Sequence, residues 1–182
     1  MNTGQTILAM GALVLLTTIM LNFYRTFHSS WDTIDSTQLG IDATSIATSL
    51  MEHAHGLAFD HVTVDTVVLP GNENLLTSPG DLGVDPGDDP VEDRIEHFND
   101  FDDFNFYDAD NPFVIDAAQN GIYHAKFDVY YIDPEVSLTE PTSESFTKRM
   151  DMWVWRVQPP PPAAAGIDTV HMWTVMGYHT YY

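Results

Sequence analysis

The residues of this chain best suited to chemistry are aspartates crowded into one acidic segment. Residues 81–110 include twelve acidic residues and one basic residue, Arg94. Hard cations such as Ca²⁺ take six to eight oxygen ligands, which closely spaced aspartates supply. No stretch fits the D-x-[DN]-x-[DN]-G frame of a helix–loop–helix calcium site. A solvated acidic loop is the favoured interpretation, and the alternative is one structural Ca²⁺ at the densest group: Asp100, Asp102, Asp103, Asp108 and Asp110.

Histidines form the second candidate group. The closest set in sequence combines His53, His55 and His61 with Glu52 and Asp60. On a helix His53 and His55 point about 200° apart, whereas an i, i+4 pair would share one face as zinc ligands do. Three further histidines, His124, His171 and His179, would meet only if the strand register aligned them. We therefore expect ordinary histidines and no zinc site.

Composition excludes several classes of function. The net charge of −21 repels nucleic acid, and the absence of cysteine excludes disulfides, thiol catalysis and iron–sulfur clusters. There is no nucleophile elbow, phosphate-binding loop or dinucleotide fingerprint. Carboxylate pairs are too numerous to single out an acid–base pair. We expect a protein that is not an enzyme and that uses no cofactor apart from the possible calcium ion.

Residues 1–24 contain no Asp, Glu, Lys or Arg. As a helix, residues 7–21 rise roughly 22 Å, and the uncharged flanks extend them toward the ~30 Å hydrocarbon core of a membrane. A secretory signal peptide would need a basic start and small residues at its exit site, whereas bulky Phe23 and Tyr24 follow this run. We expect a retained segment, a membrane anchor before assembly and a filament core afterwards. The residues expected to pack this core are Ile7, Leu8, Met10, Leu13, Val14, Leu16, Ile19 and Met20.

The first 69 residues contain no proline, as a long helix requires. The pattern predicts an apolar first half and an amphipathic continuation over residues 25–58, with an interruption near residues 28–41 where Gly40 weakens the helix. The stripe expected to face the domain is Ile46, Leu50, Ala54 and Leu57.

A domain with β structure follows over residues 59–182. Alternation over residues 61–69 predicts a strand that Pro70 ends, and residues 71–112 form a long acidic loop. The aromatic residues of this loop are expected to pack it onto the sheet: Phe98, Phe101, Phe104, Phe106 and Tyr107.

Further strands are predicted at residues 114–118, 122–132, 146–157 and 167–182. Asn120-Gly121 favours a type I′ hairpin turn between the first two. Alternation places one set of side chains on the core face: Tyr123, Ala125, Phe127, Val129 and Tyr131. The expected fold is α+β, a long N-terminal helix followed by an antiparallel sheet with a long acidic loop.

This layout resembles the type IV pilin and pseudopilin superfamily. The start of the chain, residues 3–10 (TGQTILAM), is similar to the beginning of a mature pilin, and residues 43–60 are similar to the helix end of some minor pilins and pseudopilins. The family usually carries Glu at the position of Gln5, begins with Phe rather than Met1 and often has a cysteine pair that this chain lacks. The resemblance implies processing by a prepilin peptidase, methylation of the mature N-terminus and export through the inner membrane.

Two functions follow as expectations. The first is the structural subunit of an extracellular pilus-like filament at the cell surface, whose partners are copies of itself, the membrane before assembly and pilus-type assembly machinery. The small residues Ala9, Gly11 and Ala12 would let neighbouring helices approach closely. The alternative is a singly membrane-anchored exported binding module or a minor pseudopilin of a secretion machine. Both need the same anchor and domain.

Overall fold

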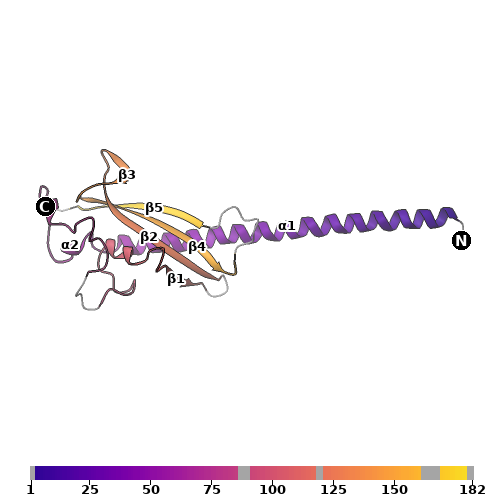
Figure 1. Cartoon of the computed structure of the whole chain (residues 1–182), viewed down its shortest axis with the longest axis horizontal. Coiled ribbons are helices and arrows are strands. Elements are labelled where there is room, and N and C mark those ends of the chain that lie inside the picture. The colour runs from indigo at the N-terminus through magenta and orange to yellow at the C-terminus, as the bar shows by residue number, and fades with distance from the viewer. Residues whose placement is uncertain (1–2, 86–90, 118–120, 161–168, 180–182) are drawn as a thin grey trace.

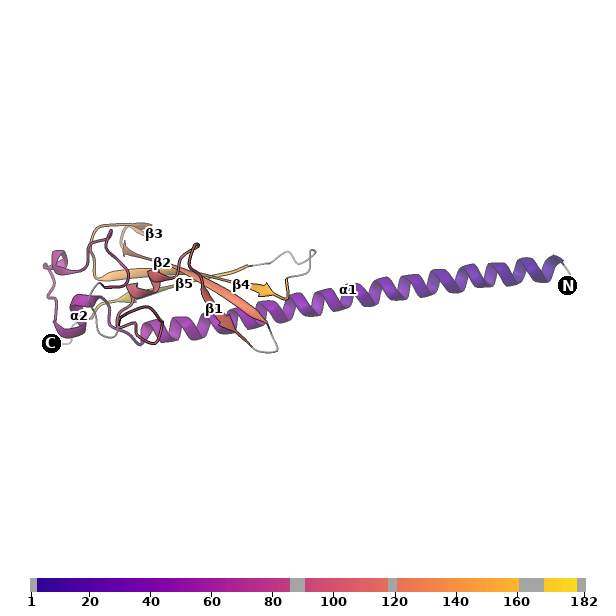
Figure 2. The same ribbon diagram turned by 60° about the horizontal axis from the view of Figure 1, so that its bottom comes forward.

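A computed structural model describes residues 3–85, 91–117, 121–160 and 169–179 of the chain. Its first element is a single helix, α1 (Thr3–His55), about 80 Å long at 1.5 Å per residue. The N-terminal half of α1 extends away from the rest of the molecule, and the C-terminal half lies along the β domain (Figures 1 and 2). The expected interruption near residues 28–41 is wrong, since the helix continues through Gly40. Leu39 and Ala43 on either side of Gly40 are buried against the domain, and this packing outweighs the ~1 kcal/mol cost of one glycine.

The sheet confirms the predicted α+β fold. Its antiparallel strands have the order β1-β2-β4-β5, and β3 pairs with the end of β2. The strands are β1 (Phe113–Asp116), β2 (Ile122–Asp133), β3 (Ser137–Pro141), β4 (Thr147–Gln158) and β5 (Thr169–Gly177). The last predicted strand is confirmed over β5, whereas residues 167–168 and 180–182 lie outside the described residues.

Alternation along β2 and β4 selects the core face of the sheet. The five side chains predicted to share one face of β2 are all buried: Tyr123, Ala125, Phe127, Val129 and Tyr131. Their partners on β4 alternate in the same way, and Val154 lies opposite Ala125 while Lys148 lies opposite Tyr131. A lysine therefore occupies a position that the period of the strand assigns to the core.

The C-terminal half of α1 covers this core face. Its buried residues are mostly alanines, and Ala43, Ala47 and Ala54 belong to the same apolar cluster as Val154 and Ala125. Ile46, Leu50 and Leu57 of the predicted stripe flank this contact and are half-buried. Small side chains at the centre of the stripe let the helix axis lie close to the sheet.

The long acidic loop packs onto the sheet through its aromatic residues, as predicted. Phe98, Phe101, Phe104 and Tyr107 are buried in the same cluster, and Phe106 is half-buried beside them. The Phe104 and Phe127 rings lie 4.9 Å apart between centroids. Two short 3₁₀ helices, η1 (Glu73–Leu75) and η2 (Asp102–Phe106), lie within this segment. Residues 86–90 lie outside the described residues.

The predicted strand over residues 61–69 is wrong. A short helix, α2 (His61–Asp65), forms there instead. Asp60 caps this helix because its side chain accepts a hydrogen bond from the Val62 N–H, and the Thr63 hydroxyl accepts one from the Asp60 N–H. This reciprocal capping box satisfies the first amides of the helix, and that local gain outweighs the alternating pattern.

The predicted hairpin forms, but its predicted register is wrong. A two-residue Asn120-Gly121 turn would pair residue 119 with Ile122, whereas Asp116 is the partner of Ile122 in the structure. The Ala117 N–H donates to the Gly121 carbonyl at 2.9 Å, and residues 118–120 lie outside the described residues. Gly121 has a φ of +108°, and a Cβ there would lie 2.0 Å from the Gln158 carbonyl oxygen. Close approach of β4 therefore requires this glycine.

Candidate functional site

The projecting half of α1, residues 3–34, is the first candidate site. The eight residues predicted to form an assembly core are 57–76% exposed. This half of α1 contains a window long and apolar enough to cross a membrane, and no part of that window is buried in the chain. Length and composition alone make it a candidate membrane span, which is weak support for anchoring because a signal sequence passes the same test.

The apolar surface continues beyond the charge-free segment. Phe27, Trp31 and Ile34 are 53–58% exposed. The rings of Phe23 and Phe27 stack with centroids 6.2 Å apart, and the rings of Phe27 and Trp31 meet edge to face at 5.9 Å. These side chains recur every three or four residues and so share one side of the helix. They form an aromatic stripe, Phe23 to Ile34, on the projecting half of α1.

The projecting half ends where α1 meets the domain. Arg156 of β4 makes two hydrogen bonds to Asp35, with Nη1–Oδ1 and Nη2–Oδ2 distances of 3.1 and 2.7 Å. Among the residues of α1 whose burial is described, Leu39 is the first that is fully buried. The ion pair therefore marks the boundary between the exposed and packed halves.

The second candidate site is a group of buried acids at the other end of the molecule. Lys148 is fully buried among them and makes an ion pair with Asp60, at 2.8 Å, and another with Asp102. Its Nζ also donates to the Phe59 carbonyl and lies over the rings of Phe59 and Tyr131. Burial by itself would raise the pKa of Asp60, but the Lys148 ammonium and hydrogen bonds from Lys148 and Tyr131 lower it. Lys148 therefore supplies the positive charge that pairs with Asp60 and Asp102.

Asp100 and Asp103 make no ion pair with Lys148 and are completely buried. Asp103 Oδ2 accepts from the N–H groups of Asn99 and Asp100, at 2.9 and 3.0 Å. Asp100 Oδ1 accepts in turn from the N–H groups of Asp102 and Asp103. The second oxygen of each carboxylate, Asp100 Oδ2 and Asp103 Oδ1, is buried and has no hydrogen-bond partner. Hydrogen bonds to one carboxylate oxygen thus fix each side chain, and the other oxygen is left without a hydrogen bond.

The ionised forms of these two carboxylates are strongly disfavoured. Burial, followed by the charges of Asp102 and Asp103, raises the pKa of Asp100 to about 10. Burial likewise raises the pKa of Asp103 to about 7, against the opposing effect of its backbone hydrogen bonds and together with the nearby charge of Glu92. Each therefore favours its neutral, protonated form unless a cation lies beside it.

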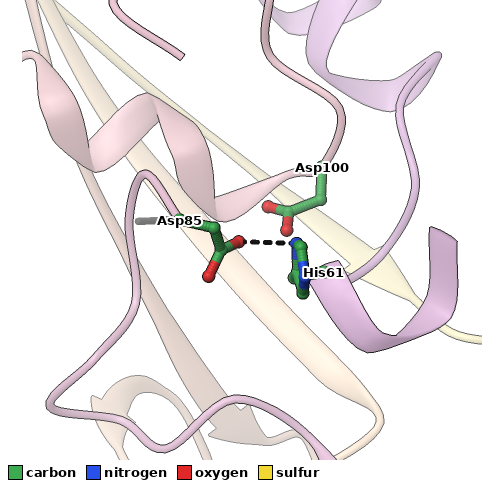
Figure 3. Close-up of side chains that lie close together, drawn as sticks. All are labelled: His61, Asp85 and Asp100. Carbon is green, nitrogen blue, oxygen red and sulfur yellow. Dashed lines mark ion pairs between the residues drawn. The ribbon is translucent and has the colours of Figure 1, made fainter. Parts of the chain in front are cut away.

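Three residues from other segments join Asp100 and Asp103. One ligand atom each from His61, Asp85 and Asp100 lie within 4.8 Å of one another, and so do atoms from Asp85, Glu92 and Asp103. Figure 3 shows the carboxylate of Asp100 directed toward Asp85 and His61, with the His61–Asp85 ion pair dashed. Asp85 belongs to both groups, so we treat the five residues as one acidic cluster.

Local structure holds the acidic cluster together. Glu92 Oε2 accepts from the Asp85 N–H at 2.9 Å, which holds these two residues side by side. His61 Nδ1 lies 2.9 Å from Asp85 Oδ2, and His61 is placed at the start of α2 by the Asp60 cap. The Ala58 N–H donates to the Asn99 carbonyl and brings the end of α1 beside Asp100. The start of α2, Asp85, Glu92 and the segment of residues 99–103 therefore converge at one point.

The buried charges around the acidic cluster do not balance. Among the described residues, Lys148 is the buried cation that pairs with these acids, whereas the buried Arg149 and Arg156 pair with Asp151 and Asp35 elsewhere. The buried carboxylates of this region are Asp60, Glu92, Asp100, Asp102 and Asp103, and Lys148 pairs with Asp60 and Asp102. Buried carboxylates without countercharge are costly, so this region requires protons or a bound cation.

The structure separates the aspartates predicted to bind Ca²⁺. Asp100 and Asp103 belong to the acidic cluster, and Asp102 adjoins it but is paired with Lys148. Asp108 and Asp110 are exposed, and Asp108 Oδ1 accepts from the N–H groups of Asp110 and Asn111 in a local turn. The favoured interpretation of a solvated loop is wrong for the three buried aspartates, because the aromatic residues between them draw the backbone onto the sheet.

Sequence reasoning missed Asp85 and Glu92 and set His61 aside. His53 and His55 lie outside the acidic cluster. His53 is hydrogen-bonded to the Ile95 carbonyl, and His55 is hydrogen-bonded to the Thr174 hydroxyl. His171 stacks on Trp153, whereas His124 meets Trp155 edge to face. The one local signal for His61 was the capping pattern of Asp60, which places His61 at the first turn of a helix.

Comparisons with protein-family models, curated proteins and solved structures find no match for the chain. The likeness to type IV pilins therefore rests on layout, a long N-terminal helix followed by an antiparallel sheet, which is compatible with a pilin-like fold.

Proposed function

We propose that this protein is the structural subunit of an extracellular pilus-like filament that assembles through the projecting half of α1. Before assembly the same helix anchors the chain in the inner membrane, from which pilus-type machinery extracts it. The observation that carries the proposal is the aromatic stripe, which continues the apolar surface of α1 beyond the length that a membrane can cover.

Helix length supports assembly over simple anchoring. Residues 3–24 span about 33 Å, enough for the ~30 Å hydrocarbon core. Phe23 and Tyr24 then fall at the membrane–water interface, where aromatic side chains are common. Trp31 and Ile34 lie roughly 10 and 15 Å further along the axis. In a singly anchored chain these two side chains would face water, whereas helices of neighbouring copies would cover them.

The shape of the projecting half also suits packing against copies of itself. Added side chains at Gly4 and Gly11 would meet nothing within 4 Å in the chain, so these positions are open. Together with Ala9 and Ala12 they let a second helix approach closely, which is how helices associate without charges. The acidic domain, at a net charge of −21 for the chain, stays soluble on the outside of such a bundle.

The test is a matched pair of substitutions in the producing cells. Trp31→Glu places a charge on the aromatic stripe, and Ser29→Glu places the same charge on the opposite side of the same helical turn. Fibres sheared from the cells are then viewed by negative-stain electron microscopy, and the chain is quantified in fibre and membrane fractions. We expect fibres dominated by this chain in the wild type, and a larger loss for Trp31→Glu than for Ser29→Glu.

The alternative function predicts a different outcome. A singly anchored binding module would stay in the membrane fraction as a monomer, and neither substitution would change its distribution. A minor pseudopilin would form a small fraction of any fibre. Either result would contradict the proposal that this chain is the main subunit.

A further inference from the structure

We propose that the acidic cluster is a Ca²⁺ site, in which Asp85, Glu92, Asp100 and Asp103 supply carboxylate oxygens to one ion. The inference is independent of the filament proposal, since it concerns the β domain and the long loop rather than the projecting half of α1. It assigns a role to charged groups that neither packing nor the ion pairs of Lys148 account for.

The donor atoms are already positioned. Asp100 Oδ2 and Asp103 Oδ1 are completely buried and have no hydrogen-bond partner, although the opposite oxygen of each side chain is held by two backbone N–H groups. Fixed carboxylates that each keep one oxygen without a hydrogen bond are the donors that a preorganised site requires. Asp85 reaches both, with ligand atoms within 4.8 Å in each group.

The charge of the site selects a divalent cation. Four carboxylates converge, and Lys148 is occupied by Asp60 and Asp102. Neutralising these carboxylates with protons would take one proton for each, whereas one divalent ion balances two charges and attracts the remaining carboxylates.

The chemistry of the donors selects Ca²⁺ among divalent ions. Carboxylate oxygens dominate the site, the chain has no cysteine, and Ca²⁺ tolerates irregular sets of six to eight oxygens that water completes. Zn²⁺ prefers four ligands rich in nitrogen and sulfur. Among the described residues, His61 is the histidine grouped with these carboxylates, and its Nδ1 lies 2.9 Å from Asp85 Oδ2. We therefore assign His61 to positioning Asp85 rather than to binding the ion.

A bound ion would add a direct link between parts of the long loop that already meet through hydrogen bonds, an ion pair and apolar packing. Asp85 and Glu92 come from the middle of the long loop, and Asp100 and Asp103 come from the entry to η2. Lys148 of β4 adjoins the same group through Asp102. The ion would thus fasten the long loop against the sheet.

The experiment uses the full chain in detergent, stripped of metal by a chelator. Equilibrium dialysis with ⁴⁵Ca²⁺ measures the stoichiometry and affinity, and thermal unfolding is followed with CaCl₂ or with NaCl at matched ionic strength. We expect one Ca²⁺ per chain and an unfolding temperature that CaCl₂ raises well beyond the NaCl effect. Equal effects of the two salts would indicate screening of surface charge and would overturn the site.

Asp103→Asn is the diagnostic variant, because it keeps the shape of the side chain and removes its charge. We expect its Ca²⁺ affinity to fall roughly tenfold or more, since the number of charged ligands sets the affinity of such sites. In chelator the variant should be at least as stable as the wild type, because a buried charge is gone. The two unfolding temperatures should therefore cross as Ca²⁺ is added, which a purely structural carboxylate would not produce.

Asp110→Asn is the matched control, an exposed aspartate of the same loop outside the acidic cluster. We expect it to bind Ca²⁺ as the wild type does. Failure of the wild type to bind, equal binding by Asp103→Asn, or saturation by Zn²⁺ in preference to Ca²⁺ would each overturn the proposal.

Discussion

The two ends of this molecule place their side chains in opposite ways. At the N-terminal end, α1 exposes large apolar residues such as Leu13 and Trp31, and at the other end the domain buries carboxylates such as Asp100 and Asp103. Each arrangement is unfavourable for an isolated chain in water. The first requires an apolar cover and the second requires positive charge. Under our two proposals, neighbouring helices or lipid cover the first end and a Ca²⁺ ion neutralises the second.

Replacing Lys148 should have the largest effect on the domain. Lys148→Met keeps the length of the side chain but leaves Asp60 and Asp102 buried without their cation, which should cost about 3–5 kcal/mol of unfolding free energy. Chemical denaturation of the full chain in detergent measures this. Lys126→Met is the control, because Lys126 lies over the Trp153 ring on the other face of the sheet and should cost under about 1 kcal/mol. Equal losses would show that Lys148 is not the essential countercharge.

The matching change at the other end is Leu13→Asp. A carboxylate at the centre of a membrane-like core costs about 2.5–3.5 kcal/mol, and a fibre repeats that cost in every subunit. We expect fibre yield to collapse while the denaturation midpoint of the domain stays unchanged, because Leu13 lies in the projecting half. Leu13→Met should assemble normally. Normal fibres from Leu13→Asp would refute a packed helical core.

Replacing single alanines of α1 with leucine tests which half of the helix packs against the domain. Ala47 is fully buried in the core cluster, so Ala47→Leu should overpack the contact with the sheet and cost about 1–3 kcal/mol. Ala12→Leu makes the same change in the projecting half and should leave the stability of the domain within about 0.5 kcal/mol of the wild type. The comparison fails if both variants shift the denaturation midpoint equally.

The smallest effect is expected at the boundary ion pair. The Asp35 side chain is 45% exposed, so Asp35→Asn should cost under about 1 kcal/mol and less at high salt. Hydrogen bonds from Arg156 lower the pKa of Asp35. Its contribution is therefore complete above the unfolded pKa of ~3.9 and disappears as pH falls through the folded value. The stability difference between wild type and variant should be constant from pH 7 to 5 and shrink below about pH 4, as measured by denaturation at each pH.

Sequence patterns predicted the elements whose signal is local and periodic. The alternation of β2 identified its core face, and the proline-free opening identified α1. The α2 error came from weighing alternation over residues 61–69 above the capping pattern of Asp60 and Thr63. Both signals were present, and the one that satisfies backbone amides prevailed.

The acidic cluster was harder to predict because it depends on the path of the long loop. Asp100 and Asp103 were candidates on density alone, whereas Asp85 reaches them only because the aromatic residues of the loop dock on the sheet. The sequence does contain one indication of the site. The two-residue period of β4 places Lys148 on the same face as Met150 and Met152. A lysine on a core face implies a buried acid beside it, although the sequence does not say which.

The uninterrupted course of α1 has a mechanical consequence. With no break at Gly40, the helix and the domain meet along one continuous contact from Asp35 to the end of α1. A pull along the axis of the molecule therefore loads this contact in shear, so that its interactions resist together rather than one after another. A hinge at Gly40 would instead let the domain swing and peel from its edge. Tension applied to the domain is thus carried directly into the projecting half of α1.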